Sequence, residues 1–300
     1  MSLRDNIPYE NSFEYKLFLK HFQETNNLYW TQFIENSTIK KLEKDFKKKY
    51  PDKAPIDFFI VSDKYDKQLP QEFSVYEKNS NQLISFIRGS ILVYAVSNLE
   101  FYIRNICLLA LESRPGLIFK QAENIDGLLL LKRDSKYGQR KDNEIFMSIV
   151  NSITEGEWNK RISNYQKIFG DKVEIFMKDV SILEFIRNYR NNFAHNISRK
   201  KETYGDYENL IVQPVDSIAH ETLIRYLKII HNLAKQIDKH LYTDYVGSYE
   251  LLKYYVKFNK NPKDPVEQHA VKFRKFIGFT GKESIGDKYF KEIIKYYESL

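Results

Sequence analysis

The sequence predicts a mainly α protein: a four-helix bundle core with a small N-terminal unit and a helical C-terminal extension. Apolar residues recur with a helical period over several long segments, whereas one short segment has the features of a strand. Apolar residues make up 42% of the 300 residues and aromatic residues 15%, which supplies a packed core and argues against global disorder.

The N-terminal unit is predicted to span residues 1–70. Residues 12–50 read as two helices, and the second ends in the basic run from Lys40 to Lys49, shortly before two prolines. Residues 56–61 (IDFFIV) are short, apolar and bounded by proline and Ser-Asp, so we expect a strand there.

The central unit, residues 71–245, opens with its longest predicted helix. From Ser80 to Pro115 the isoleucines and leucines fall on one broad helical stripe, and Pro115 with the following glycine ends it. At 1.5 Å per residue this helix is about 50 Å long, which suits the spine of a bundle. Gly89 within it predicts either a bend or close packing against another helix.

Three more helices complete the predicted bundle, at residues 144–168, 174–196 and 217–241. Residues 246–300 follow as the C-terminal extension and contain two or three further helical segments. The sequence shows no internal repeat and no low-complexity tract.

The segments between these helices have their own character. Leu128–Leu131 is a short apolar patch, and residues 132–142 after it read as an exposed polar loop. Residues 198–207 form a basic polar loop, and residues 210–214 read as a short extended piece.

Charge and cysteine content limit the classes of function. The net charge of +7, from 47 basic and 40 acidic residues, favours a polyanionic partner only weakly because the excess is spread thin. Cys107 is the only cysteine, which excludes intramolecular disulfides and thiolate zinc clusters, and its apolar surroundings predict burial.

The sequence shows no recognisable secretion or membrane signal, which favours the cytoplasm. The N-terminal residues lack the apolar core of a signal peptide, and no uncharged apolar stretch is long enough to span a bilayer. We therefore expect a cytoplasmic protein without a membrane partner.

The familiar motifs of several enzyme classes are absent from the sequence. It contains no Walker A pattern, G-x-G-x-x-G or G-x-S-x-G, so nucleotide hydrolases, Rossmann enzymes and serine hydrolases gain no support. His220, His231 and His240 recur at spacings that place no second ligand one helical turn away, so we expect no metal site and no cofactor.

The segment RNNFAH, residues 190–195, carries the most chemical information. It places an arginine, an asparagine and a histidine near the end of the third predicted bundle helix. A guanidinium can hold a phosphate, and an imidazole can move a proton near neutral pH. Because RNA supplies its own nucleophile, the 2′-hydroxyl, these groups could support cleavage without a metal.

An ideal helix separates the apolar and polar residues of this segment. The apolar stripe consists of Ile182, Ile186, Tyr189 and Phe193, and the opposite side carries Arg187, Asn191 and His195. Arg190 and His195 diverge by about 140° on such a helix, so their meeting at one phosphate requires a distortion near Asn192 or a second subunit. The alternative interpretation is a plain helix C-terminus, where cations stabilise the helix dipole by about 0.3–1 kcal/mol.

The segment resembles the R-x4–6-H motif of the ribonucleases in the HEPN superfamily (higher eukaryotes and prokaryotes nucleotide-binding). Arg190, Asn191 and His195 match that motif, with apolar residues before the arginine and Phe-Ala before the histidine. The resemblance covers about residues 71–245 and leaves the two terminal segments unexplained.

This resemblance implies an HEPN-like bundle, a homodimer with its site where two motifs meet, and metal-independent endoribonuclease activity. Arg190, Asn191 and His195 are then the catalytic residues. In that reading His195 assists attack of the 2′-hydroxyl or protonates the leaving oxygen. Arg190 stabilises the phosphorane charge, and Asn191 orients a phosphate or the imidazole.

The resemblance also implies RNA as a partner, a setting in toxin–antitoxin systems or antiviral defence, and an antitoxin or regulatory protein as a further partner. We expect RNA contacts from Arg187, Arg199, Lys200 and Lys201, and Arg187 is the other candidate for the phosphate-binding arginine. A toxin subgroup has a modifiable tyrosine two residues after the histidine, where this chain has Ile197, so regulation by that route is not expected.

Two other functions stay open at this point. A non-catalytic HEPN bundle would serve as a dimerisation, RNA-binding or nucleotide-binding module. A plain nucleic-acid-binding protein would use its basic runs, including residues 132–141, and would bind DNA and RNA alike with a steep dependence on salt.

Two polar features of the first bundle helix have structural interpretations. Asn98 lies on the apolar stripe, where a hydrogen bond to another helix is favoured over a place in the catalytic cleft. Glu100 and Arg104 have the spacing of a solvated ion pair on the far side of the helix.

Overall fold

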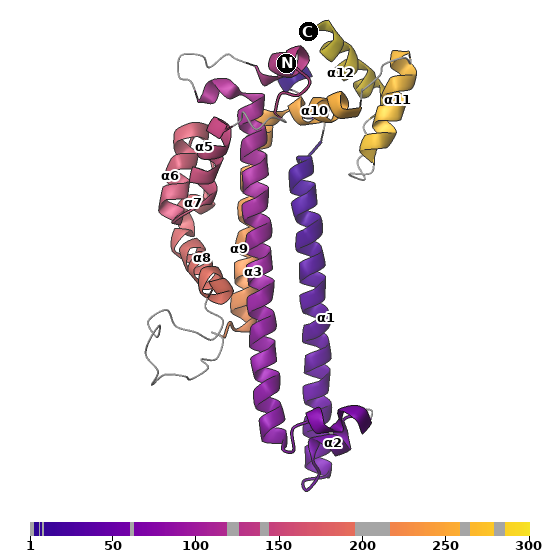
Figure 1. Cartoon of the computed structure of the whole chain (residues 1–300), viewed down its shortest axis with the longest axis vertical. Coiled ribbons are helices and arrows are strands. Elements are labelled where there is room, and N and C mark those ends of the chain that lie inside the picture. Colours follow the sequence, from indigo (N-terminus) through magenta and orange to yellow (C-terminus); the bar gives the residue numbers. More distant parts are fainter. Residues whose placement is uncertain are drawn as a thin grey trace. The chain divides into compact units, whose positions relative to one another are not determined.

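The computed structural model describes residues 3–5, 7, 9–60, 63–118, 126–138, 144–195, 217–258, 265–278 and 286–300. Their regular elements are all helical, so the prediction of a mainly α fold is confirmed (Figure 1). The α-helices are α1 (Phe13–Lys49), α2 (Pro55–Phe58), α3 (Phe73–Ser113), α4 (Gly127–Arg133), α5 (Glu144–Thr154), α6 (Trp158–Phe169), α7 (Ile175–Lys178), α8 (Val180–His195), α9 (His220–Leu241), α10 (Tyr249–Phe258), α11 (Val266–Ile277) and α12 (Asp287–Ser299). Shorter helical turns lie at Leu3–Asp5, Asp63–Gln68, Pro115–Leu117 and Tyr242–Val246.

Two compact units divide the chain. Unit 1 comprises residues 1–20, 98–184 and 229–300, and unit 2 comprises residues 21–97 and 185–228. The division passes through α1, α3, α8 and α9, so each of these helices contributes to both units. The organisation into residues 1–70, 71–245 and 246–300 stays a prediction.

Unit 1 contains most of the buried side chains. The C-terminal half of α3 is deeply buried there, with Leu99, Tyr102, Ile106 and Cys107 at most 1% exposed. The predicted burial of Cys107 is thus confirmed, and burial raises the pKa of its thiol.

Buried carboxyl groups hold the start of α1 in unit 1. Glu250 accepts a hydrogen bond from the backbone N–H of Phe13 at 2.9 Å, and Asp238 accepts one from the N–H of Ser12 at 3.2 Å. The Ser12 hydroxyl in turn accepts from the N–H of Tyr15 at 3.0 Å. These bonds supply partners for the N–H groups that a helix start leaves unpaired.

Unit 2 contains the linked ends of α1 and α3, which lie side by side with α2 at that end (Figure 1). Lys40 of α1 donates a hydrogen bond to Asn81 of α3 at 2.9 Å. The ring of Phe58 in α2 packs 5.2 Å from Phe46 and 6.3 Å from Phe73. These aromatic contacts fix the connection between the two long helices.

Two predictions for the N-terminal unit were wrong. Residues 13–49 form one continuous helix rather than two, and the segment contains no glycine or proline that would interrupt it. A strand was expected at residues 56–61, but the first three of these residues belong to the helix α2. Pro55 stands at the first helical position, and the Asp57 carboxylate accepts from the N–H of Ala54 at 3.0 Å, both of which favour a helix start.

Helix boundaries also differ from the prediction elsewhere. α3 begins at Phe73 rather than near Ser80, and the expected helix at 144–168 is split into α5 and α6. The split occurs at Gly156, whose φ of 84° breaks the helix. The expected helix at 174–196 is likewise divided into α7 and α8.

The patch at Leu128–Leu131 belongs to α4, so the polar loop expected from residue 132 begins two residues late. Asp126 caps this helix by accepting a hydrogen bond from the N–H of Leu128 at 2.9 Å. Three helices, α10, α11 and α12, occupy the C-terminal extension as expected. The extended piece expected at residues 210–214 lies outside the described residues.

The two polar residues singled out on α3 have clear structural roles. Asn98 donates a hydrogen bond to the carbonyl of Phe18 at 3.0 Å, which confirms its structural interpretation. Glu100 pairs with Arg161 of α6 at 3.0 Å, whereas its expected pair with Arg104 stays a prediction. Arg161 is 4% exposed, which makes this a largely buried ion pair.

Among the described helices, α3 alone is long and apolar enough to cross a membrane by length and composition. Core helices of soluble proteins meet the same criterion. Part of the apolar window is buried in the protein, so the finding does not by itself place the chain in a membrane.

Candidate active site on α8

The candidate motif occupies the last two turns of α8, in unit 2. Ile186 and Tyr189 are buried, as the predicted apolar stripe requires. The rings of Tyr189 and Phe193 stack with centroids 6.0 Å apart. One side of the helix is therefore committed to packing, and the polar residues are not needed to fill the core.

Gly89 of α3 receives this packed face of α8. A Cβ atom added to Gly89 would overlap the ring of Phe193 and lie 2.8 Å from the hydroxyl of Tyr189. The predicted alternatives for Gly89 are thus resolved in favour of close packing. This contact fixes the end of α8 that carries the motif.

The polar residues of the motif share an intermediate exposure. Arg190 is half-buried with its Nε atom buried, and Asn191 is also half-buried. Arg187 is half-buried too, and it donates an exposed hydrogen bond to its neighbour Asn188 at 2.9 Å. A half-buried guanidinium is well placed to act on a phosphate, because a lower local dielectric strengthens its field, and this holds for both arginines.

The backbone of α8 is helical without interruption to His195. His195 is the last residue of the helix, and its side chain lies outside what the structure describes. The described backbone shows no distortion near Asn192, so Arg190 and His195 of one chain are not brought together by an irregular helix. The other way for these two side chains to meet at one phosphate is through a second subunit.

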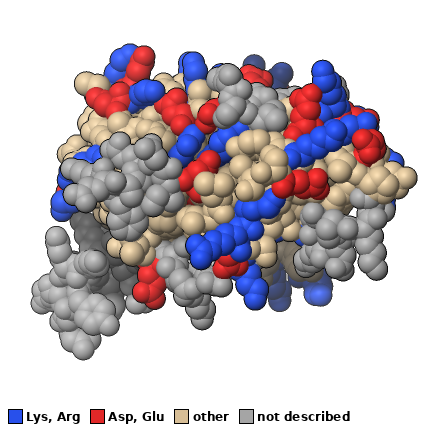
Figure 2. Space-filling model, turned by 90° about the horizontal axis from the view of Figure 1, so that it is seen from above, with Lys and Arg blue, Asp and Glu red and all other residues tan. Residues whose placement is uncertain are grey.

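The expected RNA contacts are only partly described. Arg199, Lys200 and Lys201 lie in residues 196–216, outside the described part of the chain. Lys132, from another basic run, donates hydrogen bonds to the carbonyls of Tyr297 and Glu298 at 2.5 and 2.8 Å, which is a structural role. On the face shown in Figure 2, basic and acidic side chains are interspersed.

A second cluster of functional groups in unit 2 was missed by sequence reasoning. The hydroxyl of Tyr29 in α1 lies 2.5 Å from Nδ1 of His220, the first residue of α9. The imidazole of His220 stacks on the ring of Phe33 at 4.3 Å between centroids. Arg88 of α3 donates to the carbonyl of Ile218 at 3.1 Å. Tyr29 and His220 are 191 residues apart, so no local spacing in the sequence signals their contact.

This cluster links three helices, and two opposing effects act on the pKa of its tyrosine, Tyr29. Burial raises the pKa of Tyr29, while the nearby Arg88 lowers it in part. The neutral phenol can donate to the imidazole, and aromatic packing restrains the ring. The arrangement is that of a structural joint between α1, α3 and α9.

The other described histidines with hydroxyl partners lie in unit 1. His231 lies 3.5 Å from the hydroxyl of Tyr15, His240 lies 2.8 Å from that of Tyr165, and His269 lies 3.3 Å from that of Tyr255. Burial lowers the pKa of His231 and His240, which favours neutral rings. No group of three or more potential metal ligands occurs among the described residues.

Comparison with known families gives one match. The model of the RiboL-PSP-HEPN domain family matches residues 64–243, which is more than half of the chain and includes α3, α8 and α9 in full. No curated protein and no solved structure gives a match. The matched range contains the whole candidate motif.

Proposed function

The chain belongs to the RiboL-PSP-HEPN family, and on that basis we propose that it is a metal-independent endoribonuclease. The observation that carries the proposal is the position of Arg190, Asn191 and His195 on the last turns of α8, within the family domain. HEPN membership by itself favours a nuclease or RNA-related role; the motif directs the proposal to cleavage.

The proposed reaction uses the 2′-hydroxyl of RNA as the nucleophile. As the 2′-oxygen bonds to phosphorus, its proton passes to a base, the bond to the 5′-oxygen breaks, and that oxygen takes a proton. The products are a 2′,3′-cyclic phosphate and a 5′-hydroxyl. His195 performs proton transfer, Arg190 stabilises the extra charge on the phosphorane, and Asn191 orients a phosphate oxygen or the imidazole. Positioned proton transfer and charge stabilisation each contribute about two to three orders of magnitude in rate.

A homodimer suits this chemistry because it supplies two motifs. Leu83 and Tyr94 of α3 are 57% and 52% exposed and lie within about 20° of each other around the helix. Phe86, 43% exposed, lies between them in sequence, and its ring centroid is 5.6 Å from that of Phe193 in the motif helix. This exposed apolar stripe therefore borders the motif.

Association of two chains through the stripe would remove apolar surface from water and bring the two α8 ends together. Arg190 of one chain could then face His195 of the other, which answers their divergence on a regular helix. Two imidazoles would also be present, one as the base for the 2′-hydroxyl and one as the acid for the leaving oxygen.

We propose a biological setting by analogy with other HEPN ribonucleases. We place the protein in the cytoplasm, in toxin–antitoxin or antiviral defence, where cutting RNA halts growth and an antitoxin or regulatory protein restrains the activity. Arg187, Arg199, Lys200 and Lys201 would contact the RNA around the cleaved phosphate.

The test is incubation of the full chain with a mixed RNA pool in EDTA. We expect cleavage with 2′,3′-cyclic phosphate ends, identified by mass spectrometry. His195→Ala and Arg190→Ala should each lower the rate by about 10²–10³-fold or more while circular dichroism and Tm stay unchanged. His21→Ala is the matched control, because its side chain is 43% exposed and lies on α1.

Undiminished cleavage in both motif variants would reject the site, and Arg187→Ala would show whether that arginine holds the phosphate instead. Loss of cleavage in EDTA would reject a metal-independent reaction. A chain that leaves all RNA intact but still binds RNA or a nucleotide would be a non-catalytic HEPN module.

A further inference from the structure

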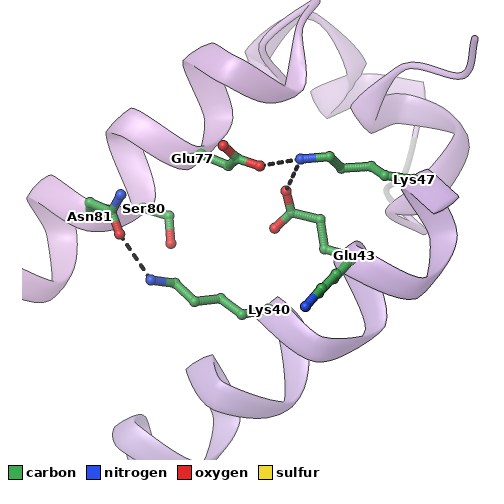
Figure 3. A pocket seen from close by; sticks show the side chains of 7 residues that line it. Lys40, Glu43, Lys47, Glu77, Ser80 and Asn81 are labelled. Carbon is green, nitrogen blue, oxygen red and sulfur yellow. Dashed lines mark hydrogen bonds and ion pairs between the residues drawn. The ribbon is translucent and has the colours of Figure 1, made fainter. Parts of the chain in front are cut away.

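A second polar site lies away from the motif, between the linked ends of α1 and α3 in unit 2. It is a cavity of about 370 Å³, within the size range of small-molecule pockets. Figure 3 shows its lining: α1 contributes Lys40, Glu43 and Lys47, and α3 contributes Glu77, Ser80 and Asn81. Lys44 of α1 also lines the cavity.

A buried carboxyl group forms part of the wall. Glu43 is 5% exposed, and its Oε1 atom accepts no hydrogen bond from the described residues. Nζ of Lys47 lies 3.7 Å from that oxygen and also pairs with Glu77 across the cavity (Figure 3). A buried polar atom without a hydrogen bond costs about 1–3 kcal/mol, so a bound molecule that offers this oxygen a hydroxyl group would be favoured.

The pKa values of the two carboxyl groups, Glu43 and Glu77, are shifted in opposite directions. Burial raises the pKa of Glu43, and the neighbouring Glu77 raises it further. The hydrogen bond from Lys47 lowers the pKa of Glu77. Proton uptake by the pair therefore falls on Glu43 before Glu77.

The remaining groups give the cavity a positive balance. Lys40, Lys44 and Lys47 follow one another at spacings of four and three residues, which places them on one face of α1. Asn81 accepts from Lys40 at 2.9 Å, and this leaves its amide N–H groups as further donors. Three ammonium groups against two carboxyl groups leave an excess of positive charge, which disfavours a metal cation and favours an anion with several acceptor oxygens.

We propose that this cavity binds a terminal phosphate group, with Lys40, Lys44 and Lys47 as its cations and Ser80 and Asn81 as its hydrogen-bonding partners. A terminal phosphate carries close to two negative charges and three acceptor oxygens, which matches this set of donors. The cavity is larger than a phosphate ion alone requires, so it has room for part of the molecule that carries the phosphate. A small phosphorylated molecule and the phosphorylated end of an RNA share this chemistry.

The site is separate from the proposed ribonuclease chemistry. The α1 wall lies before residue 64, where the family match begins, and only the α3 wall lies inside it. The inference does not depend on RNA cleavage by the motif. It is a binding claim that can fail or hold whatever the catalytic test shows.

The experiment is calorimetric titration of the full chain carrying His195→Ala, so that RNA probes stay intact. The probes are AMP against adenosine, and an RNA hexamer with a 5′-phosphate against the same hexamer with a 5′-hydroxyl. We expect tighter binding of a phosphorylated probe than of its partner. The double variant Lys40→Ala with Lys44→Ala should weaken that binding about tenfold or more, because it removes two charge-assisted contacts.

The matched control is Lys41→Ala with Lys48→Ala, which removes the same charge from exposed positions of α1 that do not line the cavity. It should change the affinity by about twofold at most. Glu43→Gln should retain binding, because its amide places a donor in the wall without a charge. Circular dichroism of each variant checks that α1 and α3 remain folded.

Each outcome decides between sources or rejects the site. Preference for AMP over adenosine supports a small phosphorylated ligand, and preference only between the RNA hexamers supports an RNA end. Equal affinity for phosphorylated and unphosphorylated probes overturns the proposal. Equal weakening by the two double variants also overturns it, because that result reports general attraction to a basic helix.

Discussion

Unit 1 and unit 2 differ in which side chains they bury. Unit 1 buries ionisable groups together with their hydrogen-bond partners, as with Arg4, Arg161, Asp238 and Glu250, each at most 4% exposed. Unit 2 leaves most of the large exposed apolar side chains on the surface, among them Leu28 at 69% and Ile34 at 61%. The proposed catalytic motif and the proposed phosphate site both belong to unit 2.

This difference indicates which unit contributes most to folding stability and which unit contacts partner molecules. A buried ion pair is costly to break, whereas an exposed pair contributes little. An exposed apolar surface does not stabilise the isolated chain and is typical of a surface that contacts a partner. Unit 1 thus has the features of the stable core and unit 2 those of the interacting part.

The largest expected effect is in unit 1, at Arg4. Its side chain is bound to the Asp126 carboxylate at 3.0 Å and to the carbonyls of Val246 at 2.9 Å and Ser113 at 3.1 Å. Arg4→Ala leaves these acceptors without their donor and should lower the free energy of unfolding by about 3–5 kcal/mol, measured by urea denaturation.

Lys53→Ala in unit 2 is the comparison, because its pair with Asp57 is exposed. It should change the free energy of unfolding by about 0.5 kcal/mol or less. If the two variants lose similar amounts, the contrast between the units does not hold.

The next effect is a pH dependence that also belongs to unit 1. Burial raises the pKa of Glu250 to about 8, well above the value of about 4.3 in an unfolded chain. The folded state therefore holds the proton more tightly than the unfolded state. This contribution to stability is full below about pH 4 and is lost as the pH rises to about 8, with a slope of up to about 1.4 kcal/mol per pH unit.

Glu250→Gln should remove this slope, which urea denaturation at a series of pH values would measure. Glu24→Gln is the control in unit 2, where the side chain is 57% exposed, and it should leave the slope in place. A slope of the same size in the Glu250 variant would mean that another group causes it.

The smallest effect on folding, and the one that tests unit 2 as the interacting part, is at the exposed stripe of α3. Leu83→Asp with Tyr94→Asp should change the free energy of unfolding by about 0.5 kcal/mol, because both side chains are exposed. The same double variant should shift the chain from dimer to monomer in analytical ultracentrifugation and lower RNA cleavage.

Leu129→Asp is the matched control, since Leu129 is 51% exposed but lies on α4 in unit 1. Its sedimentation should equal that of the unchanged chain. A chain that is monomeric throughout, or a double variant that still dimerises, would contradict association through this stripe.

Sequence periodicity located most of the helices but not their continuity. Residues 56–61 show why: a short apolar run fits a strand or a buried helical turn, and the choice was made by Pro55 and by the packing of Phe58 against Phe46. Gly156 is the opposite case, because one residue with positive φ divides a segment whose apolar period continues past it.

Site residues that are neighbours in the sequence could be predicted, whereas contacts between distant residues could not. The segment at residues 190–195 is contiguous, so the motif and its place at a helix end could be predicted. The partner of His220 is Tyr29, and the partner of Lys40 is Asn81; pairs so far apart show no pattern in one sequence. Glu100 shows the same limit, since the sequence suggested only a local partner and the structure adds the distant Arg161.

The sequence by itself determined the helical class, the burial of Cys107 and the placement of the motif at a helix end, because each of these depends on residues within a few turns of one another. Only the tertiary structure decided that Gly89 packs against Phe193, that four of the histidines lie beside tyrosine hydroxyls, and that α1 and α3 form the walls of a cavity lined by lysines. The physical reason is range: helix periodicity and capping act between near neighbours, whereas packing and burial act between surfaces that meet only when the chain has folded.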